Sequence, residues 1–303
     1  MAIVFALLAA GANALATVFQ RIGVEEATPI SASLHSLMVS VLRRPIWFAG
    51  LALTTASFLL QATALALGDL SIVQPIMVTE IVFLVVILGT WFHHGFGWRE
   101  WLGAFGTAAG LGVFLALSSS RGGTERPTKD EWFLLVGACL VGTALTWAAA
   151  RRGSRSWRAA CLGIGAGVAF ALTAALIKTT ADQWSQGLAY VFTHFEAYGV
   201  AVTGLVGFVI CQNALRAGPI AASQSALLIV NPLASIIMGT WLFGDRVQAS
   251  GMRGYFEAAS LVVMFVALYV LSHSPLIAAD GYPEELSTAR RALTGIGAER
   301  WSD

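Results

Sequence analysis

The 303-residue chain carries few charged residues for its length, and this restricts the class of protein to which it belongs. Apolar residues make up 57% of the sequence and charged residues only 12%, about half the share found in soluble domains. A water-soluble fold of this size could not bury so much apolar surface, whereas the hydrocarbon of a bilayer solvates it. The net charge of +1 argues against a nucleic-acid partner, which would require a strong basic excess.

Nine stretches of the sequence are long and apolar enough to cross a bilayer as helices, for which about 20 residues suffice. No basic n-region precedes the first stretch, so we expect it to remain as an anchor and not to be cleaved as a signal peptide. Residues after Ser272 become polar and predict a soluble tail. The nine expected spans are Ala2–Phe19, Ile46–Leu67, Ser71–Phe92, Trp98–Leu117, Trp132–Ala150, Ala159–Ile177, Phe195–Leu215, Ile220–Phe243 and Tyr255–Leu271.

A tenth segment, Ile30–Leu42, is shorter than a span and rich in serine. We expect it to form an interfacial or partly inserted helix, and we keep a full crossing as the alternative. In a nine-span chain, 12 lysine and arginine residues then lie on one side of the membrane and six on the other. By the positive-inside rule, the side with 12 is cytoplasmic. This places the protein in the cytoplasmic membrane with its C-terminus in the cytoplasm in either version.

The sequence resembles itself at an offset of 150 residues. Nine identities fall in the 35 positions from Phe58 to Phe92. Five crossings separate the equivalent helices, an odd number, so the two halves are inverted with respect to each other. Inverted repeats around a midplane site are typical of secondary transporters. The recurring residues are Phe58, Ala64, Leu65, Gly68 and Gln74, which match Phe208, Ala214, Leu215, Gly218 and Gln224, and Ile87, Gly89, Thr90 and Trp91, which match Ile237, Gly239, Thr240 and Trp241.

These observations predict an all-α, polytopic transmembrane bundle of nine to ten spans, built from two inverted repeats of four helices. The first repeat covers residues 1–118 and the second covers residues 151–272. Residues 119–150 form an extracytoplasmic loop and a connecting helix, and residues 273–303 form the cytoplasmic tail.

Several short motifs occur within residues 1–272: Gln20-Arg21, Arg43-Arg44-Pro45-x-Trp47, Ala64-Leu65-Ala66-Leu67-Gly68, Val73-Gln74-Pro75, Gly218-Pro219 and Leu242-Phe243-Gly244-Asp245. These motifs resemble those of the drug/metabolite transporter superfamily. They resemble EamA-type proteins and, because the second helix of a ten-span chain is shortened, the NIPA-like branch associated with magnesium transport. The resemblance implies transport of a small solute and does not name it. In the second half the acid Asp245 follows Gly244, whereas the corresponding segment of the first half, His94-Gly95-Phe96, contains no acid.

Glu80 lies at the middle of the third expected span. A charged carboxylate at that depth costs roughly 2.5–3.5 kcal/mol on insertion scales. The functional interpretation is a coupling group that takes up and releases a proton, or a cation site. The structural interpretation is a protonated acid that hydrogen-bonds a neighbouring helix and only holds the bundle together.

Polar side chains recur at helical spacing on three spans, so each set shares one helix face. If these faces converge, they line a polar cavity; the alternative is that they pack helices together, as Gly103, Thr107 and Gly110 are expected to do. Pro232 should kink or loosen its helix. Asn13, Thr17 and Gln20 form the first set, Thr54, Ser57 and Gln61 the second, and Gln224, Asn231 and Ser235 the third. The candidate substrate or coupling-ion residues are Glu80, Asn13, Thr17, Gln20, Gln61, Gln74, Gln224 and Asn231.

No cofactor or metal site is expected. The cysteines Cys139, Cys161 and Cys211 lie inside apolar runs without C-x-x-C spacing, and His93-His94 is expected at an interface. No serine, histidine and aspartate set or phosphate-binding glycine loop indicates an enzyme.

The leading hypothesis is alternating-access transport of a small polar or cationic solute, coupled to protons through Glu80. A NIPA-like magnesium carrier is a narrower version, weakened because Glu80 is the only central carboxyl group. Two further hypotheses are a flippase for a lipid-linked substrate and a non-transporting assembly partner, and a homodimer is compatible with each. A solvent-reachable cavity at Glu80 would favour transport, whereas tight packing around it would favour the assembly partner.

Overall fold

The computed structural model describes residues 1–25, 45–91, 97–117, 127–218, 220–245 and 252–273, and within these ranges the secondary structure is helical, without strands. Nine of the described helical segments are long and apolar enough to cross a membrane. The expected all-α polytopic fold is therefore confirmed, and the protein has the architecture of a multi-pass membrane protein. The segment Ile30–Leu42, His93-His94 and the tail after residue 273 lie outside the described residues.

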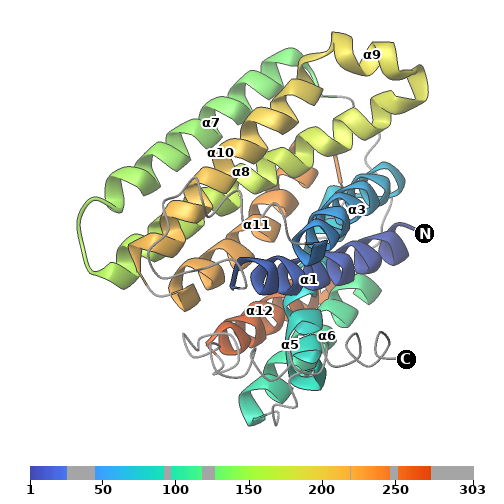
Figure 1. Cartoon of the computed structure of the whole chain (residues 1–303). Helices are drawn as coiled ribbons and strands as arrows, with labels where there is room; N and C mark the ends of the chain where they lie inside the picture. The colour runs from blue at the N-terminus through green and yellow to red at the C-terminus, as the bar shows by residue number, and fades with distance from the viewer. Residues whose placement is uncertain (26–44, 92–96, 118–126, 219, 246–251, 274–303) are drawn as a thin grey trace, which may run out of the picture.

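The helices follow the expected spans closely, and α7, α8 and α10 lie side by side along one flank of the bundle (Figure 1). A Thr128–Glu131 capping box begins α7, and the Ser154 side chain accepts the N–H of Trp157 at the start of α8. The elements are α1 (Ala2–Glu25), α3 (Pro45–Leu67), α4 (Leu70–Met77), α5 (Glu80–Trp91), α6 (Trp98–Leu117), α7 (Lys129–Ala149), α8 (Arg155–Gln183), the 3₁₀ turn η1 (Trp184–Gln186), α9 (Leu188–Thr193), α10 (Phe195–Ala217), α11 (Ile220–Leu242) and α12 (Met252–Ser272).

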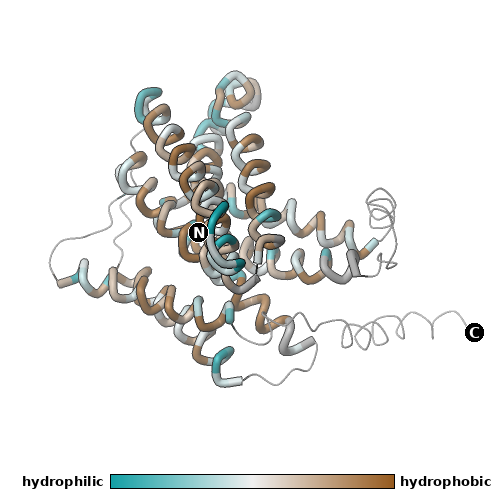
Figure 2. Tube along the Cα trace, turned by 90° about the vertical axis from the view of Figure 1, so that its left-hand side faces the viewer, coloured by the Kyte–Doolittle hydropathy of each residue, from teal (hydrophilic) through white to brown (hydrophobic). Residues whose placement is uncertain are grey.

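Large apolar side chains cover the outside of the bundle. Phe133 and Leu134 of α7 are 81% and 64% exposed, and Val202 and Leu205 of α10 are similarly exposed. Figure 2 shows apolar residues distributed along the helices of the bundle. Apolar surface on this scale would destabilise a soluble monomer, so these faces are the ones that contact lipid.

The first two long helices, α1 and α3, pack antiparallel. Ala2 lies against Gly68, the Ser57 hydroxyl donates to the Ala9 carbonyl, and the Gln20 amide donates to Thr54. The end of α1 and the start of α3 are therefore at the same end of the bundle. This arrangement agrees with the nine-span version, in which the chain begins on the side where α3 ends. We name that side the Lys178 end and the opposite side the Arg155 end.

The third span is not the continuous helix that the sequence predicts. It breaks into α4 and α5 at Val78 and Thr79. The Thr79 N–H and hydroxyl both donate to the Ile76 carbonyl. In an uninterrupted helix the Glu80 N–H would donate to this carbonyl. Pro75 has no N–H to donate within the same segment. Glu80 therefore lies in the first turn of α5 and not in the middle of a helix. By contrast, α11 continues through Pro232.

Glycines bring pairs of helices close together, as predicted. A Cβ atom on Gly110 of α6 would lie 2.7 Å from the backbone nitrogen of Met264 and 2.8 Å from the carbonyl oxygen of Ser260 in α12. Gly163 of α8 is in similarly close contact with the Ser223 carbonyl of α11. Small residues at such positions let backbones approach and gain dispersion energy in a bilayer, where the hydrophobic effect does not drive helices together.

Two glycines on α6 provide a matched test of this packing. We expect Gly110→Ala to destabilise the protein by about 1–3 kcal/mol, because the added methyl group meets backbone atoms that cannot move aside. Gly112 has no atom within 4 Å of the position of an added Cβ, so Gly112→Ala should be neutral or stabilising by up to about 1 kcal/mol. Thermal unfolding of both variants in one detergent measures the difference. Equal melting temperatures would show that the α6–α12 contact does not limit stability.

Candidate functional site

A cavity of about 500 Å³ lies in the middle of the bundle, between helices of both halves. We call it the central cavity. Six of the eight candidate residues line it, although they come from α1, α3, α4, α5 and α11: Asn13, Gln61, Gln74, Glu80, Gln224 and Asn231.

The lining of the central cavity repeats at the offset of 150 residues. Gln74 lies four residues after the start of α4, and Gln224 lies four residues after the start of α11. Since α4 begins at the Lys178 end and α11 at the Arg155 end, the two glutamines reach one cavity from opposite ends. The offset-150 pairs found in the lining are Thr54 and Gly204, Gln61 and Cys211, Gln74 and Gln224, Met77 and Leu227, and Val78 and Leu228.

Glu80 is partly accessible from the central cavity. The Asn13 side chain hydrogen-bonds the Glu80 carboxyl group, so α1 and α5 are joined at this point. Because Glu80 stands in the first turn of α5, the free N–H groups and the dipole of that helix favour the negative charge. The helix break thus compensates part of the cost of placing a carboxylate at this depth.

Two polar atoms of the cavity residues have no hydrogen-bond partner among the described residues. They are Nε2 of Gln74, a side chain that is only 2% exposed, and Oδ1 of Asn231. A buried polar group without a partner costs about 1–3 kcal/mol. One is a donor and the other an acceptor, so water or a polar solute that offers both functions would satisfy them.

The two remaining candidates do not line the cavity. Thr17 is exposed on the bundle surface, and its hydroxyl donates to the Asn13 carbonyl of its own helix. The Gln20 amide donates to Thr54 over 2.8 Å and so joins α1 to α3. Sequence reasoning missed Thr173 of α8, which lines the cavity and donates to the Ala169 carbonyl; a lone hydroxyl in an apolar span gave little signal.

Lys178 makes one contact between the two halves at the Lys178 end of the bundle. Its side chain is buried, and Nζ donates to the Gly68 carbonyl over 3.0 Å and to the Leu65 carbonyl over 3.4 Å. The ammonium group also lies 5.5 Å from the ring centroid of Phe243. These contacts tie α8, in the second half, to the end of α3, in the first.

Asp245 makes a second contact between the halves. Gly244, with φ of +66°, turns the chain after α11, and Asp245 Oδ2 then accepts the N–H and hydroxyl of Ser71 at the start of α4. Burial raises the pKa of Asp245 above its usual range, while the Ser71 bonds and Lys178 act in the opposite direction. The Gly-Asp pair singled out in the sequence therefore caps a helix of the other half. We refer to the Lys178 and Asp245 contacts together as the latch.

The chain is similar to a curated protein over most of its length. An uncharacterised protein of Corynebacterium glutamicum is 28% identical over 279 residues, which cover 90% of this chain and 95% of that protein. The similarity therefore includes both halves. No protein-family model matches the chain, and no solved structure matches it.

Proposed function

We propose that the protein is a secondary transporter that moves a small polar or cationic solute by alternating access, with Glu80 as the proton-coupling group. The observation that carries this proposal is the central cavity, which both halves line with polar side chains and which gives access to Glu80. An inverted-repeat transporter requires equivalent residues that approach one cavity from opposite ends. When the two halves exchange their conformations, the cavity closes on one side of the membrane and opens on the other.

The cavity also favours transport over a purely structural role. A subunit that only supports an assembly has no need of a solvated space around a mid-membrane acid, and the unpartnered Gln74 and Asn231 atoms would be costly in such a subunit. Magnesium transport is less well supported than transport of an organic solute. Glu80 is the one acid among the described lining residues, and hard divalent cations prefer several oxygen ligands.

Uptake by purified protein in liposomes tests the proposal. A panel of amino acids, amines, polyols and magnesium would be assayed with and without an imposed pH gradient. We expect at least one organic solute to accumulate only when the gradient is present. Absence of uptake for the whole panel, by protein that is folded and correctly inserted, would favour the assembly-partner hypothesis.

Topology follows from the asymmetry of positive charge and can be tested separately. We expect a reporter fused after Asp303 to lie in the cytoplasm and a cysteine placed at Gly122 or Gly123, introduced with the three native cysteines replaced, to react with an impermeant thiol reagent in intact cells. This orientation would make the Lys178 end extracytoplasmic. Labelling of the loop only after the cells are permeabilised would reverse the orientation.

A further inference from the structure

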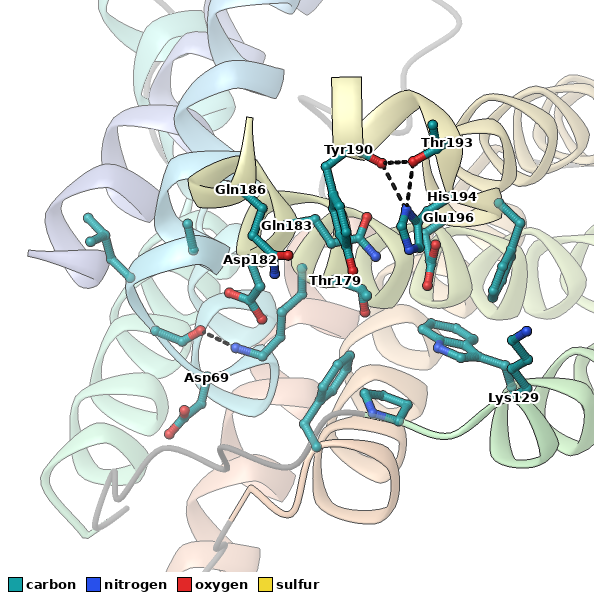
Figure 3. A pocket seen from close by; sticks show the side chains of 18 residues that line it. Asp69, Lys129, Thr179, Asp182, Gln183, Gln186, Tyr190, Thr193, His194 and Glu196 are labelled. Carbon is teal, nitrogen blue, oxygen red and sulfur yellow. Dashed lines mark hydrogen bonds between the residues drawn. The ribbon is translucent and has the colours of Figure 1, made fainter. Parts of the chain in front are cut away.

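A second cavity, of about 830 Å³, lies at the Lys178 end, and Figure 3 shows the side chains around it. We call it the vestibule. It is formed by the α3–α4 turn, the starts of α7 and α10, the end of α8 with η1 and α9, and Phe243. It shares no described lining residue with the central cavity, although Lys178 of the vestibule directly follows Ile177 of the central cavity. Lys178 therefore lies where the two spaces are adjacent along α8.

The vestibule contains a buried carboxyl group with an unused oxygen. Glu196 is only 6% exposed, and its Oε2 atom has no hydrogen-bond partner among the described residues. It is the second residue of α10, so it lies at the positive end of that helix's dipole. A carboxylate oxygen is an acceptor only, so a ligand at this position must supply a donor, and a positively charged donor gives the strongest bond.

The cations that line the vestibule do not supply that donor. Lys178 is engaged by the Gly68 and Leu65 carbonyls, and Lys129 is exposed at the start of α7. The described lining carries three acidic side chains, Asp69, Asp182 and Glu196, against these two lysines. The excess of negative charge favours a cationic occupant.

Aromatic rings restrict the chemistry of this cation. Trp132, which is 3% exposed, makes an edge contact with Phe195, with ring centroids 6.2 Å apart, and Tyr190 also lines the space. Aromatic faces attract ammonium groups, most strongly when water is excluded. Inorganic divalent ions prefer several oxygen ligands, and the described residues include no cluster of three or more metal-ligating side chains.

We propose that the vestibule is a separate binding site for a monovalent organic ammonium ion, which Glu196 pairs and the surrounding rings cover. The role of this site as the entry point for the solute rests on the proposed transport function, whereas binding itself does not. An alkylammonium group uses both parts of the site, since its charged head bonds the carboxylate and its chain contacts the rings.

Binding to the purified full-length protein in lipid nanodiscs tests this proposal without transport. The probe is n-butylammonium, measured by calorimetry, with n-pentanol as a neutral probe of similar shape and sodium and magnesium as inorganic cations. We expect n-butylammonium to bind at least about tenfold more tightly than each of these comparison probes. Glu196→Gln should weaken it at least about tenfold, and Tyr190→Leu should weaken it several-fold while leaving the carboxylate in place.

Glu80→Gln distinguishes the vestibule from the central cavity. We expect this variant to bind n-butylammonium as the unmodified protein does, whether or not it transports any solute. Loss of binding in Glu80→Gln with full binding in Glu196→Gln would place the ammonium ion in the central cavity and overturn the proposal. Equal affinity for n-pentanol, or no binding at all, would also overturn it. If Glu196→Gln does not fold, unchanged affinity in Tyr190→Leu serves as the contradicting result.

Discussion

Glu80→Gln should reduce pH-gradient-driven uptake to the level of protein-free liposomes while leaving exchange of internal for external solute. The amide keeps the size of the side chain and can still hydrogen-bond Asn13, but it cannot take up or release a proton. We therefore expect the variant to lose the steps that require residue 80 to change its charge. We expect it to retain the exchange of internal for external solute, which requires no such change. Radiolabelled uptake and counterflow in the same liposomes measure the two activities.

A second buried acid provides the control for this variant. Glu100 of α6 is 3% exposed and does not line the central cavity, so Glu100→Gln should retain gradient-driven uptake if it folds. Unaltered gradient-driven uptake in Glu80→Gln would show that another group couples transport to protons. Misfolding of Glu80→Gln would support the structural interpretation of Glu80, because glutamine is the closest neutral mimic of the protonated acid.

Lys178→Met should open the Lys178 end of the central cavity. The substitution keeps an unbranched apolar chain but removes the charged donor to the Gly68 and Leu65 carbonyls. Hydrogen bonds to charged groups contribute roughly 1.5–3 kcal/mol, which corresponds to an increase of about 10- to 150-fold in the open population. Cys211 lines the cavity and reports this change when Cys139 and Cys161 are replaced by alanine. An impermeant thiol reagent added at the Lys178 end should label Cys211 faster by about that factor.

Lys129→Met is the matched control, because Lys129 also lines the vestibule but is exposed. It should leave the labelling rate of Cys211 unchanged, and Lys178→Arg should restore much of the slow rate. Equal rates for Lys178→Met and the unmodified protein would show that the latch does not control access.

The spans could be predicted from the sequence because a bilayer imposes one simple demand, an uninterrupted apolar length with every backbone group bonded. The break before Glu80 could not be predicted, because it depends on which donor reaches the Ile76 carbonyl. The side chain and backbone of Thr79 both compete with the Glu80 N–H for that single acceptor. Hydropathy contains no information about such a competition.

Helical spacing predicted which polar residues share a face, but it could not say what that face meets. Asn13 and Gln20 belong to the same set, yet Asn13 faces the cavity and Gln20 is engaged by Thr54 of the neighbouring helix. The repeat was the better guide, because its matched glutamines, Gln74 and Gln224, both reach the cavity. The latch depends on contacts between α3 and α8 and between α4 and the end of α11, which no local pattern encodes.

The position of Glu80, about halfway along the third span at the break between α4 and α5, has an electrical consequence. A proton that reaches this carboxyl group from either side crosses only part of the membrane potential, and a charged solute adds the contribution of its own charge. Moving one elementary charge through the whole potential changes the free energy by about 2.3 kcal/mol per 100 mV. Turnover should therefore respond to voltage at constant pH, and the part of the response that the proton contributes should disappear together with the titratable group at position 80.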